Sequence, residues 1–260
     1  MFDPDDGCRS LDLQSAGQVI GDLRRLAVAM SALSAGSPCP AGGPVAWNSP
    51  STARDGRLQT ARPAVIVQEF KGKTTMANVM AICGSLRKGS FNRMLMNASI
   101  AAAPAGMTIK EGPSYAGFPI YNFDIQNSSG FPADVDAYAD AVRKADGLLI
   151  VSPEYNWSIP AGLKNMIDWL SRYKEVPFKD KPVAIQSAAG GLLGGSRMQY
   201  HLRQSLTSID VQLFGKPEVI VAQAAQKFDA ATGLKDQTTL DLVKQQMEAF
   251  AKFIDRVKVK

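Results

Sequence analysis

Residues 78–92 read NVMAICGSLRKGSFN and carry the transition that sets the fold class. NVMAIC is apolar apart from Asn78 and stops at a glycine, as a buried strand does. GSLRKGSFN then brings two serines, an arginine, a lysine and an asparagine, and the RMLMNASIAAA that follows has helical character. The stretch therefore predicts a buried strand, a polar turn and the start of a helix, which is an arrangement suited to binding an anion.

The alternation of strands and helices continues to the end of the chain. Strands are expected at 78–84, 107–112, 146–153, 181–189 and 216–222, and helices at 91–103, 132–145, 160–173, 196–209 and 236–257. This pattern is typical of βαβ units and predicts an α/β fold, a flavodoxin-like doubly wound sheet of five parallel strands in the order 2-1-3-4-5. Ligands of such sheets bind beyond the carboxyl ends of the strands, which here are followed by the loops 84–92, 112–123, 152–160 and 187–196.

The bulk composition excludes several classes of protein. The 260 residues are 45% hydrophobic and 20% charged, which is typical of a soluble globular chain without a membrane span. The net charge of +5 favours anionic ligands, but Lys and Arg are scattered, so no nucleic-acid partner is expected. Three cysteines without a C-x-x-C pair, and one histidine, argue against a metal site and favour a reducing, cytoplasmic location.

Residues 1–75 differ from the remainder in composition. They are rich in Gly, Pro, Ser and Ala without a sustained period, which predicts a low-complexity, disordered extension ahead of a domain at 76–260. Arg24 and Arg25 before the apolar run LAVAMSALSA resemble a twin-arginine signal, although about twenty residues, several of them acidic, come first. A third interpretation is upstream sequence translated from an early start, because the regular pattern opens at Met76.

The polar turn at 84–92 favours a phosphate. It lacks the spacing of a Walker loop and of a dinucleotide fingerprint. It offers a helix N-terminus, hydroxyls from Ser85 and Ser90, the amide of Asn92 and the guanidinium of Arg87. These groups suit one terminal phosphate held without a metal. The alternative is that Ser90 only caps the helix and that Arg87 is a solvated surface charge.

A second loop, SPEYNWSIPAGLKNMIDWLSR at 152–172, favours a flat ring. A strand is expected to end at Ser152, after which an acid, two aromatic residues and an asparagine crowd into the turn before the next helix. Aromatic side chains can contact the faces of a ring system, and turn amides can bond its edges. The alternative for Tyr155 and Trp157 is a surface or interface cluster.

The two motifs together, GSLRKGSFN and PEYNWSIPAGLKNMIDWLSR, resemble the NAD(P)H-dependent FMN reductase family, and within it the bacterial quinone and chromate reductase branch. The resemblance covers residues 76–260, whereas residues 1–75 have no counterpart in it. It implies FMN as cofactor, NADPH or NADH as co-substrate, a quinone-like small-molecule acceptor, and a homodimer or homotetramer.

The resemblance also implies where FMN binds. The phosphate loop is expected at Ser85, Leu86, Arg87, Lys88, Gly89, Ser90, Phe91 and Asn92, one ring-side turn at Pro153, Glu154, Tyr155, Asn156 and Trp157, and another at Ala188, Ala189, Gly190 and Gly191. Three residues depart from the family pattern. Ala189 stands where a hydroxyl residue is common, which removes one polar contact to the ring, Ala161 stands where a glycine is common, and Trp157 where a tyrosine is common.

The flavin, rather than a protein acid or base, is expected to carry the chemistry. The nicotinamide would give a hydride to flavin N5, and the electrons would pass to a quinone, with chromate or azo dyes as adventitious acceptors. No catalytic side chain and no metal are expected. The alternative is a flavodoxin-like electron carrier that binds FMN without turning over NAD(P)H. The positive net charge argues against it, since such carriers are expected to be strongly acidic.

The remaining candidate residues are expected to be structural. Cys83 is predicted to be a core residue, and His201 a packed or interfacial one. The helical spacing of Lys164, Asp168 and Arg172 predicts a charge ladder on a solvated or subunit-facing surface. Arg197, Tyr200 and Glu218 are expected to form a hydrogen-bond network between subunits.

Overall fold

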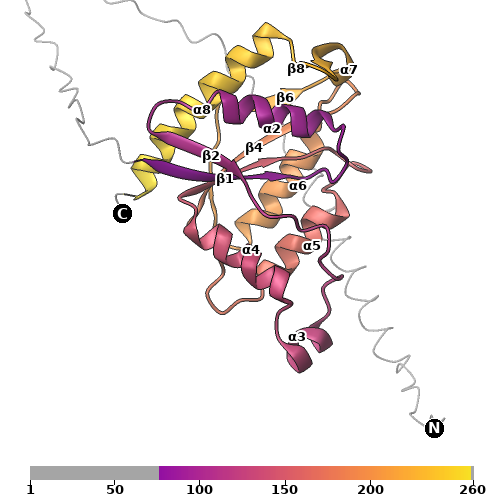
Figure 1. Ribbon diagram of the computed structural model, residues 1–260, viewed down its shortest axis with the longest axis vertical. Helices are drawn as coiled ribbons and strands as arrows, with labels where there is room; N and C mark the ends of the chain where they lie inside the picture. Colours follow the sequence, from indigo (N-terminus) through magenta and orange to yellow (C-terminus); the bar gives the residue numbers. More distant parts are fainter. Residues whose placement is uncertain (1–75, 259–260) are drawn as a thin grey trace, which may run out of the picture. The chain divides into compact units, whose positions relative to one another are not determined.

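A parallel β-sheet lies between two layers of helices in the computed structural model, which describes residues 76–258 (Figure 1). The expectations about residues 1–75 lie outside the described part of the chain. The strands are β1 (Ala77–Cys83), β2 (Met107–Glu111), β3 (Gly147–Val151), β4 (Pro182–Ala188), β5 (Gln212–Leu213) and β6 (Val219–Val221). Their order, β2-β1-β3-β4-β5 with all neighbours parallel, confirms the predicted flavodoxin-like topology.

Two short strands pair with the outer side of β4, of which β5 lies outside the predicted range 216–222 and β6 inside it. β5 pairs with Pro182 and Val183 at the start of β4, and β6 pairs with the last three residues of β4. Pro217 lies between the two strands and has no N–H group to donate to a neighbouring strand. The prediction of one strand at 216–222 was therefore correct only for its second half.

Helices cover both faces of the sheet (Figure 1). One core cluster joins α2 (Phe91–Ala101) and α8 (Gln237–Lys258) to one face, and another joins α4 (Ala133–Lys144), α5 (Ala161–Leu170) and α6 (Ser196–Thr207) to the opposite face. Successive side chains of β1 alternate between the clusters, with Val79 and Ala81 in the first and Met80 and Ile82 in the second. This two-sided burial explains the near-continuous apolar pattern of the central strands.

Besides β5, four short elements were not predicted from the sequence. They are α3 (Phe123–Ser129), α7 (Ala224–Lys227) and the hairpin of β7 (Phe228–Asp229) and β8 (Gly233–Leu234). α3 has no buried residue, so it lacks the apolar periodicity that predicts a helix. The described residues contain no helix long and apolar enough to cross a membrane.

Gly84 ends β1 at a point where two strands come unusually close. Its N–H donates to the carbonyl of Val151 at the end of β3, with a distance of 2.8 Å. A Cβ added at Gly84 would lie 2.3 Å from Oγ and 2.9 Å from Cα of Ser152. A side chain at this position would therefore push apart the strands that carry two of the candidate loops.

Gly84→Ala is expected to lower the free energy of unfolding by about 1–3 kcal/mol, because the added methyl group overpacks the contact with Ser152. Chemical denaturation with equal slopes for both proteins measures the difference. Gly215→Ala is the matched control, since a Cβ there would meet nothing within 4 Å. Equal stabilities for the two variants would contradict this account of Gly84.

Candidate functional site

The loops after β1, β3 and β4 meet at the carboxyl edge of the sheet. The three strands are neighbours, with Cys83 paired to Val151 and Val151 paired to Gln186. Backbone bonding continues just beyond them, because Ser152 N–H donates to the Gln186 carbonyl at 3.0 Å. The three loops in which the sequence predicted the site are thus brought together at the position where doubly wound sheets bind ligands.

The loop after β1 presents a run of free backbone donors. Ser85 and Ser90 are buried at its ends, and residues 86–89 are exposed between them. Ser90 is the N-cap of α2, where its Oγ accepts from the N–H of Asn92 at 3.2 Å. Among residues 76–258, no protein acceptor is found for the backbone N–H groups from Ser85 to Phe91. With the positive end of the helix dipole and the charge of Arg87 beside them, these donors suit a phosphate.

Asn92 uses its side chain differently from the sequence expectation. It is 2% exposed, its Nδ2 donates to the carbonyl of Ala188 at 2.8 Å, and its Oδ1 accepts from the Ala188 N–H at 2.9 Å. Both polar atoms of the side chain are therefore engaged with the end of β4. No sequence pattern predicted this contact, which joins residues 96 positions apart.

The loop after β3 forms a tight two-residue turn. Tyr155 and Ser158 exchange two backbone hydrogen bonds of 3.0 and 2.9 Å, and between them Asn156 and Trp157 have φ angles of +49° and +66°. Two successive left-handed residues define a type I′ turn, which is unfavourable for a bulky side chain such as tryptophan. The turn holds the Trp157 side chain outward, with 67% of it exposed. Pro153, at the start of the same loop, is half-buried.

The carboxylate of Glu154 ties this turn to α6. Its side chain is only 8% exposed, Oε1 accepts from Nε of Arg197 at 2.8 Å, and Oε2 accepts from the N–H of Met198 at 3.2 Å. The Arg197 guanidinium in turn lies over the Trp157 ring, 4.4 Å from its centroid. Because its carboxylate is engaged with α6, Glu154 can contact a ligand at the edge of the sheet only through its backbone.

His201 supplies a second contact between α6 and the turn. Its Nδ1 lies 3.1 Å from Oγ of Ser158, so α6 holds the turn at both of its ends. The sequence placed Arg197 in a network between subunits with Tyr200 and Glu218. Within the chain Arg197 pairs with Glu154, and Glu218 pairs with Arg203 at 3.3 Å. No sequence pattern distinguishes such pairs, because the partners lie on separate elements.

The turn after β4 is tied to the segment after β6, because the carbonyls of Ala189 and Gly191 accept from the N–H groups of Ala224 and Gln223 at 3.1 Å each. The Ala189 N–H donates to Val221 at 3.1 Å, which anchors the turn to β6. Gly190 and Gly191 are exposed, and a Cβ added to either would meet nothing within 4 Å. Position 195, by contrast, requires glycine, since its φ is +91° and an added Cβ would lie 2.8 Å from Cβ of Ser187.

Tyr115, in the loop after β2, bonds the end of β1 just before the predicted phosphate loop. No pattern in the sequence identified this residue. Its hydroxyl donates to the carbonyl of Cys83 at 2.7 Å, and burial raises the pKa of Tyr115 well above its usual value. The phenol therefore remains a neutral donor. Burial also raises the pKa of the Cys83 thiol, an effect that outweighs its hydrogen bond to the Ser85 carbonyl. Cys83 is thus a protonated core residue, as predicted.

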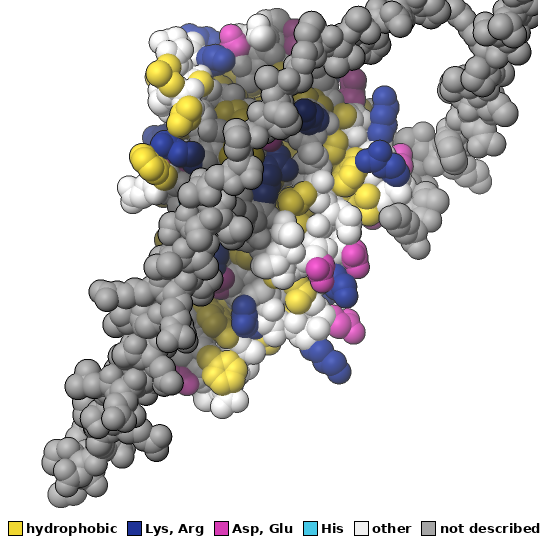
Figure 2. Space-filling model, turned by 180° about the vertical axis from the view of Figure 1, so that it is seen from behind, with side chains coloured by type: hydrophobic (Ala, Val, Ile, Leu, Met, Phe, Trp, Pro, Cys, Tyr) yellow, Lys and Arg dark blue, Asp and Glu magenta, His cyan; other side chains and the backbone are white. Residues whose placement is uncertain are grey.

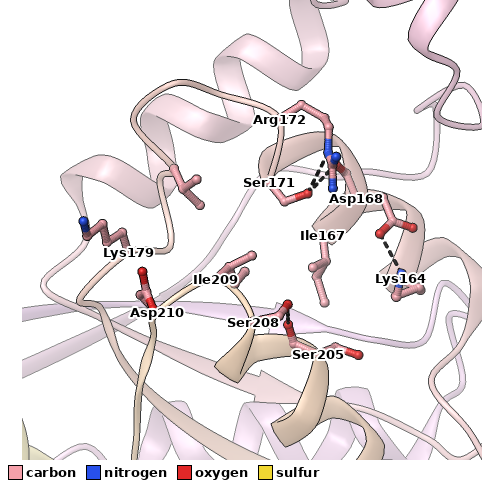
Figure 3. Close-up of a pocket in the computed structure, with 11 residues that line it drawn as sticks. Lys164, Ile167, Asp168, Ser171, Arg172, Lys179, Ser205, Ser208, Ile209 and Asp210 are labelled. Carbon is pink, nitrogen blue, oxygen red and sulfur yellow. Dashed lines mark hydrogen bonds and ion pairs between the residues drawn. The ribbon is translucent and has the colours of Figure 1, made fainter.

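A cavity lined by charged residues beside α5 is separate from these loops. It has a volume of about 450 Å³ and lies between the carboxyl-terminal ends of α5 and α6 (Figure 3). Lys164 and Asp168 pair there at 2.6 Å, and Arg172 donates to Oγ of Ser171, which confirms the predicted charge ladder in part. Helices that follow parallel strands return to the amino edge of the sheet, so this cavity points away from the candidate site.

The surface charge favours a small anionic ligand over a nucleic acid. On the visible part of the face in Figure 2, Lys and Arg side chains are separated by acidic, apolar and other residues. A nucleic-acid interface instead needs basic side chains gathered into a continuous patch. Among residues 76–258, no group of three or more His, Cys, Asp or Glu side chains is placed to hold a metal ion.

Comparison with known proteins decides the family. Residues 77–226 match the family model of NADPH-dependent FMN reductases. The chain belongs to this family. The assignment based on the two sequence motifs is thereby confirmed, and with it the class of the protein as an oxidoreductase.

Individual members of the FMN reductase family match the same region. The quinone reductase of Escherichia coli (strain K12) is 49% identical over 182 residues, which are 70% of this chain and 97% of the relative. An NAD(P)H-dependent FMN reductase of Pseudomonas aeruginosa is 43% identical over 180 residues, 69% of this chain and 96% of the relative. Among solved structures, the NAD(P)H:(acceptor) oxidoreductase FerB of Paracoccus denitrificans has a TM-score of 0.63 at 28% identity, covering 69% of this chain and 98% of that one.

Glu154→Ala is expected to reduce the free energy of unfolding by about 1–3 kcal/mol, because it leaves the Met198 N–H and the Arg197 guanidinium without their buried partner. Thermal or chemical unfolding of the flavin-free protein measures the loss. Glu248→Ala is the matched control, since Glu248 is exposed on α8. A loss no greater than that of the control would show that the ion pair contributes nothing to holding the turn.

Proposed function

We propose that this protein is an FMN-dependent oxidoreductase that takes electrons from NAD(P)H and passes them to quinones. The observation that carries the proposal is the run of backbone N–H groups from Ser85 to Phe91, at the start of α2, which have no protein acceptor among residues 76–258. These donors share one edge of the sheet with the Tyr155–Ser158 turn and with the exposed turn at Gly190 and Gly191.

The residues present fit FMN. Its phosphate would take the free amides of the first loop, the hydroxyls of Ser85 and Ser90 and the charge of Arg87. Its ring would lie between residues 153–157 and the turn at 189–190. The residues of that turn, Ala189 and Gly190, have no side-chain atoms beyond Cβ. Ala189 offers no hydroxyl, so the contacts of this turn to the ring edge must come from the backbone.

When bound, FMN supplies the hydride chemistry, accepting two electrons from a nicotinamide and delivering them to an acceptor. The chain's own residues bind and orient it. The helix dipole and amides of α2 hold the anionic end, and the α6 contacts to Glu154 and Ser158 fix the turn that would face the ring.

Relatives named for their activity support quinone as the acceptor. The 49% identical relative from Escherichia coli is a quinone reductase, and a relative from Arabidopsis thaliana, 39% identical over 190 residues, is an NADPH:quinone oxidoreductase. They do not favour the alternative of an electron carrier without NAD(P)H turnover. Chromate as a further acceptor and either NADH or NADPH as donor belong to the proposal.

A homodimer or homotetramer and a cytoplasmic location are also part of the proposal. Trp157 and Tyr200 expose 67% and 59% of their surfaces beside the site, and exposed aromatic residues are enriched where subunits meet. The thiol of Cys83 is free and buried, as expected of a chain that works in a reducing compartment.

The proposal is tested by the visible spectrum and by anaerobic reduction. The purified protein, with FMN added if needed, should show bound-flavin absorption that bleaches with NADPH or NADH and returns when a quinone is added. A protein that stays colourless with FMN present would refute the proposed function. A flavin that binds but does not bleach with either nicotinamide would support the electron carrier instead.

A chain that starts at Met76 is expected to fold and to bind FMN as the full chain does, because the described elements and the family match both begin at Ala77. Circular dichroism, size-exclusion chromatography and FMN titration of both proteins make the comparison. An insoluble or flavin-free product would show that residues 1–75 belong to the domain.

A further inference from the structure

We propose that Asn92 is a positioning residue that couples the phosphate loop to the ring-side turn after β4, and that its side chain does not hold the phosphate. The inference rests on the proposed function and deepens it. It follows from the contacts of one buried carboxamide, at the second residue of α2, with the backbone of Ala188.

The carboxamide takes the place of a missing strand. β3 is paired with β4 only as far as Val151 and Gln186, and the last bond from its side runs from Ser152 N–H to the Gln186 carbonyl. Ala188 lies two residues further along β4, so its N–H and C=O point to the same side as those of Gln186, where β3 has ended. Asn92 supplies both missing partners, at 2.8 and 2.9 Å.

Only a side chain with both a donor and an acceptor can do this. A carboxamide has the same two groups as a peptide unit, and each bond joins it to one backbone atom of the same residue. Since Ala188 and Asn92 are both almost fully buried, loss of the amide would leave an N–H and a C=O unpaired. The pair is therefore specific for asparagine rather than for any polar residue.

The bridge joins the two halves of the site. On one side Asn92 directly follows the free amides of residues 85–91, and its own N–H bonds the N-cap Ser90. On the other side Ala188 directly precedes the turn at Ala189, Gly190 and Gly191. One side chain thus links the phosphate donors directly to the ring-side backbone, so a change at Asn92 displaces the ring turn as well as the loop.

The test compares FMN with riboflavin, which has the same ring but no phosphate. Asn92→Ala should weaken both flavins, riboflavin on the order of tenfold for two lost hydrogen bonds and FMN by at least as much, and should change the visible spectrum of FMN at saturation. Arg87→Ala should weaken FMN alone and leave the saturated spectrum unchanged. Fluorescence titrations and absorption spectra of the full chain provide both readouts.

Ser99→Ala is the control for a merely structural effect. Ser99 is also buried on α2 and bonds the side chain of Gln186 on β4 at 2.8 Å, but it does not touch the ring-side turn. This variant should lose stability while the folded protein keeps both flavin affinities and the saturated spectrum. Asn92→Gln keeps both polar groups but moves them by one methylene without adding charge, so it carries the test if Asn92→Ala does not fold.

Two results would overturn the inference. A loss confined to FMN, with an unchanged spectrum at saturation, would make Asn92 a phosphate ligand. Unchanged affinities for both flavins would show that the bridge does not position the ring. A wild-type protein that binds neither flavin would instead refute the proposed function, so the two failures are distinguishable.

Discussion

Three adjacent parallel strands, β1, β3 and β4, end at one edge of the sheet, and each part of the proposed site is placed by where its strand ends. Parallel pairing needs a crossover after each strand, so the chain leaves every carboxyl end through a loop that leads into a helix. In this protein the three loops are drawn together further, because the backbone bonding of Gly84 and Ser152 continues past the last paired residues. The proximity of the loops is therefore a property of the sheet.

The polar groups at this edge fall into two sets, those with hydrogen-bond partners within the chain and those that a ligand could bond. Asn92, Glu154 and Ala188 are buried, and each has its partners within the chain. The amides of residues 85–91, in contrast, have no partner among the described residues. Unpaired donors are costly when buried but not at a surface that water or an anion can reach. The division separates the supporting framework from the part of the site that a ligand would fill.

The sequence predicted the features that depend on neighbours along the chain. The strand, turn and helix at 78–103 and the pattern of the central strands follow from local periodicity and residue type, and the structure confirms them. Ser90 also caps the helix, which was the alternative to its role in binding a phosphate. β5 was missed because it has only two residues and lies outside the predicted strand at 216–222. The partners of Glu154 and Asn92 lie 43 and 96 residues away, and only the packing of the fold selects them. Family resemblance named residues around the flavin, but did not separate those that would touch it from those that hold others in place.

The free space around Gly190 and Gly191 affects which substitutions this protein can accept during evolution. Neither glycine has the left-handed conformation that excludes other residues, and neither is packed against a neighbour. A larger side chain at either position would occupy space beside the proposed ring without disturbing the sheet or the helices. Substitution there can narrow or reshape the range of acceptors while the stability of the fold stays the same, so these two positions leave acceptor choice free to evolve independently of folding.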